Sequence, residues 1–275
     1  MEYINIWDDN VPIIKENENF TPFMTFHKAE NSIGKSVVVC PGGGYAVCCD
    51  TYEGETVAEY FNSFGVDAFV LRYSVCCVNN DKSVFPLPFE DAARAVRYIR
   101  ANAEKLSVNP DCIGIMGFSA GAHLASWVST RWDDKYSDRD DLYGSYSARP
   151  DFSVFCYGVL DLDKYTPFAV TGINLLGENA TDEDKAKFSG PLNVTPQTPP
   201  AFLFHTYSDK TVPVMNSLKY YEAMVRCGVK GELHIYEPGD HGMGLCIDVN
   251  HIAEKDRKYC EKWPQQLKKW ITEMI

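Results

Sequence analysis

The sequence predicts an α/β fold in which helices cover both faces of a mainly parallel central sheet. Short apolar runs recur along the chain, and such runs are typical of strands buried on both faces of a parallel sheet. Helical patterns fall between the runs, and this alternation is typical of a doubly wound sheet. The chain of 275 residues is long enough to bury a large core, and we expect one domain that spans residues 1–275.

Five apolar runs are predicted to form the buried strands. They are Val37–Cys40, Ala68–Leu71, Ile113–Met116, Phe152–Cys156 and Ala201–Phe204. A sixth run, Leu233–Tyr236, alternates more between apolar and polar residues. This alternation places the sixth strand nearer an edge of the sheet. Residues 1–35 are expected to form a lead-in with further strands.

Four helices are predicted between and after these strands. The first runs from Glu55 to Phe64 and ends at Gly65, because glycine commonly follows the last helical turn. The second follows Pro88 and stops at Asn109. Its apolar positions recur at helical spacing and are Ala92, Val96, Ile99, Ala103 and Leu106.

The third helix is predicted between Pro213 and Gly228, since proline is favoured in a first turn and glycine just past a helix end. Its apolar stripe consists of Val214, Leu218, Tyr221 and Val225. The fourth helix is expected to begin at Pro264. Its predicted buried residues are Leu267, Trp270 and Ile271.

Two polar segments, residues 133–150 and 161–200, interrupt the strand–helix alternation. Ligand sites in such sheets lie at the carboxyl ends of the parallel strands. We therefore expect both segments to be loop excursions over the active-site end, where they could wall a pocket. The alternative is that they are only surface loops.

Charge and hydropathy exclude several function classes. Lys and Arg number 26 and Asp and Glu 38, so the net charge is 26 − 38 = −12. This acidity argues against nucleic acid or anionic lipid as the main partner. The longest mainly apolar run, Phe152–Leu160, is far too short to span a membrane. The acidic N-terminus, Met1–Asp9, lacks the features of a signal peptide, so a cytoplasmic protein is expected.

The ten cysteines are predicted to be free thiols in a reducing compartment. The chain contains no C-x-x-C motif, so zinc-ribbon and thioredoxin-like sites have no support. Cysteines in apolar runs are expected to act as small hydrophobic residues, namely Cys40, Cys112 and Cys156. Adjacent residues rarely bridge, which argues against disulfides within the pairs Cys48–Cys49 and Cys76–Cys77. Cys48 and Cys49 closely follow the glycine-rich segment Pro41–Tyr45, so oxidation there is expected to disturb activity.

The strongest chemical motif is Gly117–Gly121, which reads G-x-S-x-G with Ser119 at its centre. The motif lies between a buried strand, Ile113–Met116, and a helix-forming segment, Ala122–Val128. A serine on such a sharp strand-to-helix turn is typical of a nucleophile elbow. The alternative is a simple glycine-rich turn, but the context favours a nucleophile.

A serine nucleophile needs a base, and His241 is the favoured candidate. It follows the serine in the chain, comes after a strand, and has Gly239 and Gly242 on either side. The other histidines fit less well: His27 precedes the serine, His123 is expected to be packed, His205 to position a loop, His234 to lie within a strand and His251 to lie in a polar stretch.

The carboxylate that orients the base is expected to be Asp209, because it lies in the loop after the Ala201–Phe204 strand. Asp209 could instead only cap the helix near Pro213. The rival carboxylates are Asp161, Asp163 and Asp240.

A glycine-rich segment, Pro41–Tyr45, directly follows the Val37–Cys40 strand. Three successive glycines allow backbone N–H groups to face a developing oxyanion without a Cβ in the way. The segment lacks the spacing of a Walker loop or a dinucleotide-binding motif. The backbone N–H of Ala120, next after the serine, is expected to be the second donor.

Together these motifs resemble the esterase branch of the α/β-hydrolase superfamily over roughly Ser36 to Gly244. They are most similar to small bacterial acetyl esterases described as acetylxylan esterases or sugar hydrolases. The segments that carry the resemblance, besides the Ser119 elbow, Asp209 and His241, are Pro41–Tyr45, Glu53–Glu55, Leu71–Tyr73, Pro88–Arg97 and Asn109–Asp111. The chain departs from many relatives at Pro41, where they have histidine.

The resemblance implies an α/β-hydrolase fold with a small cap or none. It implies Ser119 as nucleophile, Asp209 and His241 as its partners, and Gly43, Gly44 and Ala120 as oxyanion donors. It implies no metal and no organic cofactor, and homo-oligomers are common in the group. Four residues flank the motifs and either line a small apolar acyl pocket or belong to the core: Tyr45, Phe118, Tyr157 and Met243.

The resulting hypothesis is a serine carboxylic-ester hydrolase that cleaves short-chain acyl esters, with O-acetylated xylo-oligosaccharides or other neutral sugars as expected substrates. One alternative is an amidase, peptidase or formamidase that acts on small substrates with the same triad. A remote alternative is a non-catalytic binding scaffold, since a fold alone does not prove activity.

Overall fold

The computed structural model describes residues 2–7, 21–76, 83–135, 142–162, 170–246 and 252–275. Its centre is one sheet with the strand order β1-β2-β4-β3-β5-β6-β7-β8. The strands are β1 (Glu2–Asn5), β2 (Phe23–His27), β3 (Lys35–Cys40), β4 (Val66–Arg72), β5 (Ile113–Phe118), β6 (Phe152–Cys156), β7 (Ala201–Thr206) and β8 (Gly231–Tyr236).

The sheet is mainly parallel, as predicted. Every neighbouring pair from β4 to β8 is parallel, whereas β2 runs antiparallel to both β1 and β4. All six predicted strands are present, and β8 lies at an edge of the sheet as its alternating pattern indicates. Residues 1–35 contribute the two antiparallel strands at the other edge.

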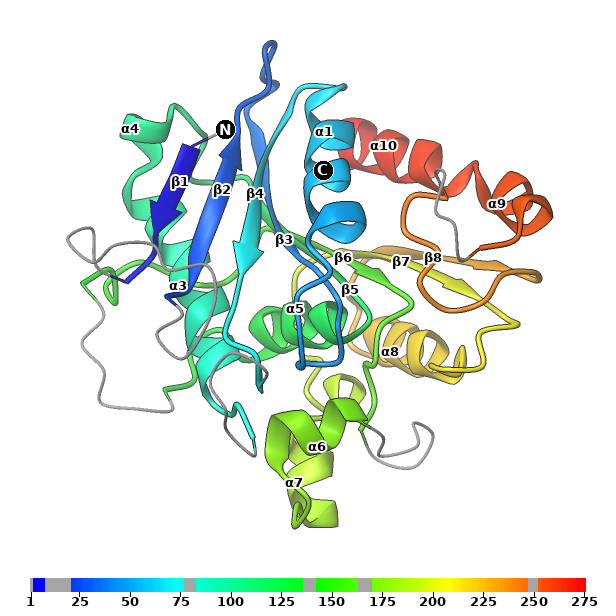
Figure 1. The fold of residues 1–275 in the computed structure, drawn as a ribbon. Coiled ribbons are helices and arrows are strands. Elements are labelled where there is room, and N and C mark those ends of the chain that lie inside the picture. The colour runs from blue at the N-terminus through cyan, green and yellow to red at the C-terminus, as the bar shows by residue number, and fades with distance from the viewer. Residues whose placement is uncertain (1, 8–20, 77–82, 136–141, 163–169, 247–251) are drawn as a thin grey trace.

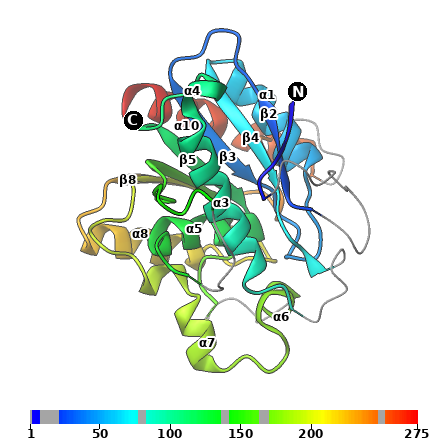
Figure 2. The same ribbon diagram turned by 90° about the vertical axis from the view of Figure 1, so that its left-hand side faces the viewer.

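Helices cover both faces of the sheet (Figures 1 and 2). α1 and α10 lie on one face, and α3, α5 and α8 lie on the other. The helices are α1 (Thr56–Asn62), α3 (Leu87–Ala101), α4 (Ala103–Leu106), α5 (Ala120–Arg131), α6 (Val170–Leu176), α7 (Asp182–Lys187), α8 (Met215–Arg226), α9 (Glu254–Cys260) and α10 (Trp263–Glu273), with a π-helical turn η1 (Thr51–Glu55) and a 3₁₀ turn η2 (Gly190–Leu192). None of the helices in the described ranges could span a bilayer.

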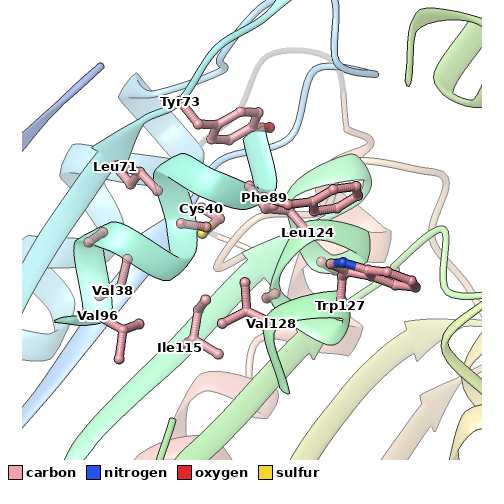
Figure 3. Packing of buried hydrophobic residues seen from close by; sticks show 14 of the residues in the cluster. Val38, Cys40, Leu71, Tyr73, Phe89, Val96, Ile115, Leu124, Trp127 and Val128 are labelled. Carbon is pink, nitrogen blue, oxygen red and sulfur yellow. The ribbon is translucent and has the colours of Figure 1, made fainter. Parts of the chain in front are cut away.

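Two hydrophobic clusters form the core, one on each face of the sheet. In β3, Val38 and Cys40 point to the α3 and α5 side, while Val37 and Val39 point to the α1 and α10 side. This alternation follows from the two-residue period of a strand. Figure 3 shows Val38 and Cys40 packed beneath α3 and α5. The wholly apolar runs are therefore explained by burial on both faces.

Two of the predicted helices differ in detail from the observed ones. The helix expected to reach Asn109 is interrupted at Asn102, so α3 and α4 are separate. The predicted apolar stripe of α8 is wrong: Val225 is 61% exposed and Leu218 is 37% exposed. The buried face of α8 instead carries Asn216, Ser217, Tyr220 and Met224. The last helix is confirmed, since α10 buries all three predicted residues, Leu267, Trp270 and Ile271.

The described part of residues 133–150 does not lie over the active-site end, where it was expected. α5 starts at the carboxyl end of β5, and the chain that follows returns to the amino end of β5, where the Asp151 N–H donates to the Ile113 carbonyl at 2.8 Å. Its described part packs beside α3: the Tyr98 and Tyr143 rings are 5.3 Å apart, and Arg97 Nε donates to the Tyr146 carbonyl at 3.2 Å.

Residues 161–200 follow the carboxyl end of β6 and include α6, α7 and η2. The segment is therefore partly helical, although its polar composition predicts only loops. α6 lies below the sheet in Figure 1, on the side toward which the β4 arrow points.

Candidate active site

Ser119 lies at the sharp junction between β5 and α5, with φ 52° and ψ −116°. A non-glycine residue rarely adopts this backbone conformation, so the turn is strained. The two glycines of the motif allow the close contacts around it. A Cβ on Gly117 would lie 2.1 Å from the Gly121 carbonyl oxygen, and one on Gly121 would lie 2.1 Å from the Cys40 carbonyl oxygen.

The three residues predicted to form a triad are connected through His241, which is within hydrogen-bond distance of both others. His241 Nε2 lies 2.9 Å from Ser119 Oγ, and His241 Nδ1 lies 2.7 Å from Asp209 Oδ2. Because the carboxylate can only accept, Nδ1 carries the proton and Nε2 is left to accept from the serine hydroxyl. Each residue follows a strand end: Ser119 follows β5, Asp209 follows β7 and His241 follows β8.

Asp209 is held in its charged form. Burial opposes that charge, but hydrogen bonds from His205 and His241, the positive charge of His241 and the Val212 N–H outweigh it and hold the pKa of Asp209 well below its usual range. Its Oδ1 accepts the Thr211 N–H at 2.9 Å and the Val212 N–H at 2.8 Å. These bonds leave Oδ2 directed at His241.

The glycine-rich segment after β3 lies beside Ser119 and has left-handed backbone at Gly43 (φ 129°) and Gly44 (φ 63°). Among the described residues, the N–H groups of Gly43 and Gly44 donate to no other backbone group. Ala120 is the first residue of α5, where N–H groups have no partner within the helix. These three N–H groups are therefore available to an oxyanion beside Ser119.

The segment is anchored at both ends. Tyr73 Oη donates to the Pro41 carbonyl at 2.6 Å, and Tyr45 Oη lies 2.8 Å from His123 Nδ1. His123 Nε2 donates to the Phe188 carbonyl at 2.8 Å, so Nδ1 is the acceptor for Tyr45. Burial lowers the pKa of His123 to about 4, despite that backbone hydrogen bond. The prediction that His123 is a packed residue is confirmed.

The other candidate histidines and acids do not reach Ser119. His205 is buried between Ser217 Oγ (2.8 Å) and the Val212 carbonyl (2.9 Å), and it thereby holds the Asp209 loop. Asp161 accepts from Ser189 Oγ at 2.6 Å and from Lys219, and Asp240 accepts the backbone N–H of His241 at 2.9 Å. His27 and His234 pair with glutamates, Glu55 and Glu232. Asp163 and His251 lie outside the described residues.

Ser119 and His241 open into a pocket of about 330 Å³. One wall is apolar and consists of Val159, Leu162, Val170 and Val212. The remaining lining residues come from the glycine-rich segment, from η1 and the turn before it, from α6, and from the Asp209 and His241 loops: Gly43, Gly44, Cys49, Tyr52, Glu53, Thr171, Gly172, Thr211 and Gly242.

The four residues predicted either to line an acyl pocket or to belong to the core do not contact the pocket. Tyr45, Phe118, Tyr157 and Met243 are each at most 1% exposed, and none of them lines the pocket. They belong to the core, since all four are members of the two hydrophobic clusters. The apolar wall comes instead from the segment after β6 (Val159 and Leu162), from α6 (Val170) and from the loop before α8 (Val212).

Sequence reasoning gave Glu53 no role, although it lines the pocket and is only 2% exposed. It lies in η1, a π-helical turn, and such turns are frequent at functional sites. Glutamate is usually exposed, so the composition of the Tyr-Glu-Gly-Glu segment predicts an exposed side chain at Glu53. Its place shortly after the glycine-rich segment was the signal that could have identified it.

All nine described cysteines carry free thiols, and Cys77 lies outside the described residues. Cys40 and Cys156 are buried, whereas Cys112 is only half-buried. Cys49 lines the pocket, where burial and then the charges of Glu53 and Asp50 raise its pKa. Within the described part of the chain, no group of three or more His, Cys, Asp or Glu side chains is arranged to hold a metal ion.

Comparison with known proteins places this geometry in a family context. The family model described as BD-FAE matches residues 25–224. Endo-1,4-beta-xylanase B of Butyrivibrio fibrisolvens is 34% identical over 245 residues, which are 89% of this chain and 38% of that protein. Acetylxylan esterase of Xylanibacter ruminicola is 34% identical over 220 residues, which are 78% of this chain and 42% of that protein. The chain thus spans about two fifths of the length of these curated relatives.

A solved structure matches over nearly the whole chain. The crystal structure of an acetyl ester-xyloside bifunctional hydrolase from Caldicellulosiruptor lactoaceticus superposes with a TM-score of 0.85 at 35% sequence identity. The match covers 99% of this chain and 96% of that one.

Proposed function

The chain belongs to the BD-FAE family of α/β hydrolases, and from this we propose that it is a serine esterase that hydrolyses short-chain acyl esters. One observation carries the proposal: the hydrogen-bonded series Asp209–His241–Ser119 ends in a pocket that Gly43 and Gly44 also line. Acyl transfer requires a serine nucleophile, a base positioned to take its proton, a carboxylate that orients the base, and N–H donors for the oxyanion.

The proposed reaction proceeds in two halves. Ser119 Oγ attacks the ester carbonyl carbon while His241 Nε2 takes the hydroxyl proton, and the carbonyl oxygen becomes an oxyanion. The N–H groups of Gly43, Gly44 and Ala120 stabilise that oxyanion. The C–O bond to the alcohol then breaks, and His241 returns its proton to the leaving oxygen. Water, deprotonated by His241, releases the acyl group as a carboxylic acid and restores Ser119.

Asp209 stays ionised throughout this cycle. Its Oδ2 accepts from Nδ1 of His241, which fixes the tautomer whose Nε2 can accept a proton. The same carboxylate stabilises the imidazolium that forms after proton transfer. The low pKa of Asp209 keeps the carboxylate charged at any pH where His241 can act as a base.

Acetyl esters of neutral sugars are the proposed substrates. Relatives named for acetylxylan and for acetyl ester-xylosides support this class. The apolar wall beside Ser119 suits an acyl chain, and the net charge of −12 disfavours polyanionic substrates.

The test is an acyl-chain series of p-nitrophenyl acetate, butyrate and octanoate, run beside acetylated xylo-oligosaccharides and matched anilides. The proposal predicts that acetate is preferred over octanoate, that acetic acid is released from the oligosaccharides, and that Ser119→Ala abolishes both activities. Faster hydrolysis of the anilides than of the esters would indicate an amidase and contradict the proposal.

A further inference from the structure

Glu53 is a buried carboxylate that the proposed reaction does not use. Its side chain enters the site from η1, directly beneath the glycine-rich segment. A Cβ on Gly42 would lie 2.6 Å from Glu53 Oε2 and 3.1 Å from Ser119 Cβ. Gly42 therefore lies between the carboxylate and the nucleophile, where a residue with a Cβ would not fit.

The two carboxylate oxygens bind two different segments. Oε2 accepts the Gly42 N–H at 2.9 Å, and Oε1 accepts the Tyr157 hydroxyl at 2.7 Å. The Tyr157 oxygen in turn accepts the Gly244 N–H at 2.9 Å. A single carboxylate thus links the glycine-rich segment, the end of β6 and the loop that carries His241.

An ionised carboxylate satisfies these partners, because both of its oxygens can accept. Gly42 N–H can only donate, and Tyr157 must donate because its oxygen already accepts from Gly244. Burial raises the pKa of Glu53, and the hydrogen bonds from Tyr157, Gly42 and Tyr52 together with the nearby His241 offset part of that rise. A glutamine could accept from Gly42, but its NH₂ group would then face Tyr157, so the two would compete as donors.

We propose that Glu53 is a positioning residue, whose carboxylate fixes Gly42 so that the next two N–H groups face the oxyanion and ties that segment to the His241 loop. This inference rests on the proposed esterase function. The ends of the segment have their own anchors, Tyr73 on Pro41 and His123 on Tyr45. Loss of the carboxylate therefore loosens the middle of the segment, where the oxyanion donors lie, while the fold persists.

The test compares Glu53→Gln with Asp50→Asn. Asp50 is a matched control, because it lies on the same short segment but pairs with Arg72 and does not line the pocket. Glu53→Gln is expected to lower kcat by about 10²–10³-fold with little change in KM, as loss of one oxyanion donor does. Binding of a trifluoromethyl ketone, which forms an oxyanion on Ser119, should weaken by a similar factor, whereas Asp50→Asn should match the wild type.

Tyr157→Phe provides a second variant, because it removes the link to Gly244 and leaves the Gly42 bond in place. Its kcat is expected to fall by about tenfold, less than that of Glu53→Gln, through loss of one hydrogen bond. The proposal is overturned if folded Glu53→Gln keeps the wild-type kcat and ketone affinity, or if its KM rises at constant kcat. If Glu53→Gln does not fold, an unchanged kcat in Tyr157→Phe overturns it.

Phosphonylation of Ser119 by a fluorophosphonate probe separates this proposal from the esterase assignment. If the wild type cleaves no ester, the proposed function fails, yet the labelling rate still depends on the same N–H groups. Slower labelling of Glu53→Gln than of Asp50→Asn supports the positioning role, and equal rates overturn it.

Discussion

Asp209 shows how much of this site depends on the direction of single hydrogen bonds. Its Oδ1 is occupied by two backbone N–H groups, from Thr211 and Val212, so only Oδ2 is free to face His241. The carboxylate therefore selects the histidine tautomer as well as its orientation. The role of the carboxylate can therefore be tested by replacing Asp209 with asparagine, which has nearly the same shape.

Asp209→Asn is expected to lower kcat by about 10⁴-fold at nearly constant KM, because the amide would keep Oδ1 on the loop and present NH₂ to Nδ1. That contact stabilises the wrong tautomer, with Nε2 protonated. Steady-state kinetics on p-nitrophenyl acetate measure the effect. Asp240→Asn is the control, because its side-chain oxygen can still accept the His241 N–H. A small loss in Asp209→Asn would argue for another orienting acid.

His123 makes stability depend on pH. Burial lowers its pKa from the ordinary 6.5 to about 4, so between these values the unfolded chain binds a proton that the native chain does not. Its contribution is complete above pH 6.5 and is lost as the pH falls toward 4, by up to about 3 kcal/mol in the free energy of unfolding. Urea unfolding at pH 7 and pH 5 should show a smaller acid loss for His123→Gln than for the wild type. Equal losses would contradict the assignment.

At the residue scale, the triad residues were predictable because each of them follows a strand and the three occur in the expected chain order. Ser119, Asp209 and His241 each follow a predicted strand, and parallel strands bring those ends to one edge. Glu53 was not predictable in this way, because its burial depends on a π-helical turn and on a partner, Tyr157, about a hundred residues away in the sequence.

At the element scale, α8 shows where apolar periodicity fails. Its buried face contains Asn216, which accepts the Asp161 N–H at 2.9 Å, and Ser217, which contacts His205. These polar residues are buried because they hold the loops around the site. A stripe chosen on hydrophobicity alone therefore points to the exposed side of the helix.

α6 forms one side of the pocket through Val170, Thr171 and Gly172. Val170→Trp should narrow the cavity and lower kcat/KM for octanoate at least about tenfold more than for acetate, as steric exclusion of methylene groups does. Leu192→Trp is the control, because Leu192 is an exposed apolar residue that does not line this pocket. An equal loss for both esters would place the acyl chain elsewhere.

At the scale of the whole molecule, the parallel sheet was predictable because strands buried on both faces leave continuous apolar runs. The antiparallel pair β1 and β2 was expected only as strands within the first 35 residues, since short strands near an edge carry mixed patterns. The position of the described part of residues 133–150 could not be predicted from polarity. It follows from the direction in which α5 returns across the sheet.

α10 closes the core on the face opposite α5. Trp270 is 4% exposed and packs against Phe202 and Phe152, with ring centroids 5.8 Å and 6.3 Å away. Trp270→Ala is expected to lower the free energy of unfolding by about 3–5 kcal/mol through loss of buried contacts. Activity per folded molecule should not change, because Trp270 does not line the pocket. Lys269→Ala, on the exposed side, should change stability by no more than about 0.5 kcal/mol.

The central claim is that Ser119 forms an acyl-enzyme. The most direct measurement is acid quenching of the protein during turnover of p-nitrophenyl acetate, followed by peptide mass spectrometry. The account predicts an acetyl group on the peptide that contains Ser119, and neither acetylation nor turnover in Ser119→Ala. Wild-type turnover by Ser119→Ala, or acetylation of Cys49 in the same pocket instead of Ser119, would contradict it.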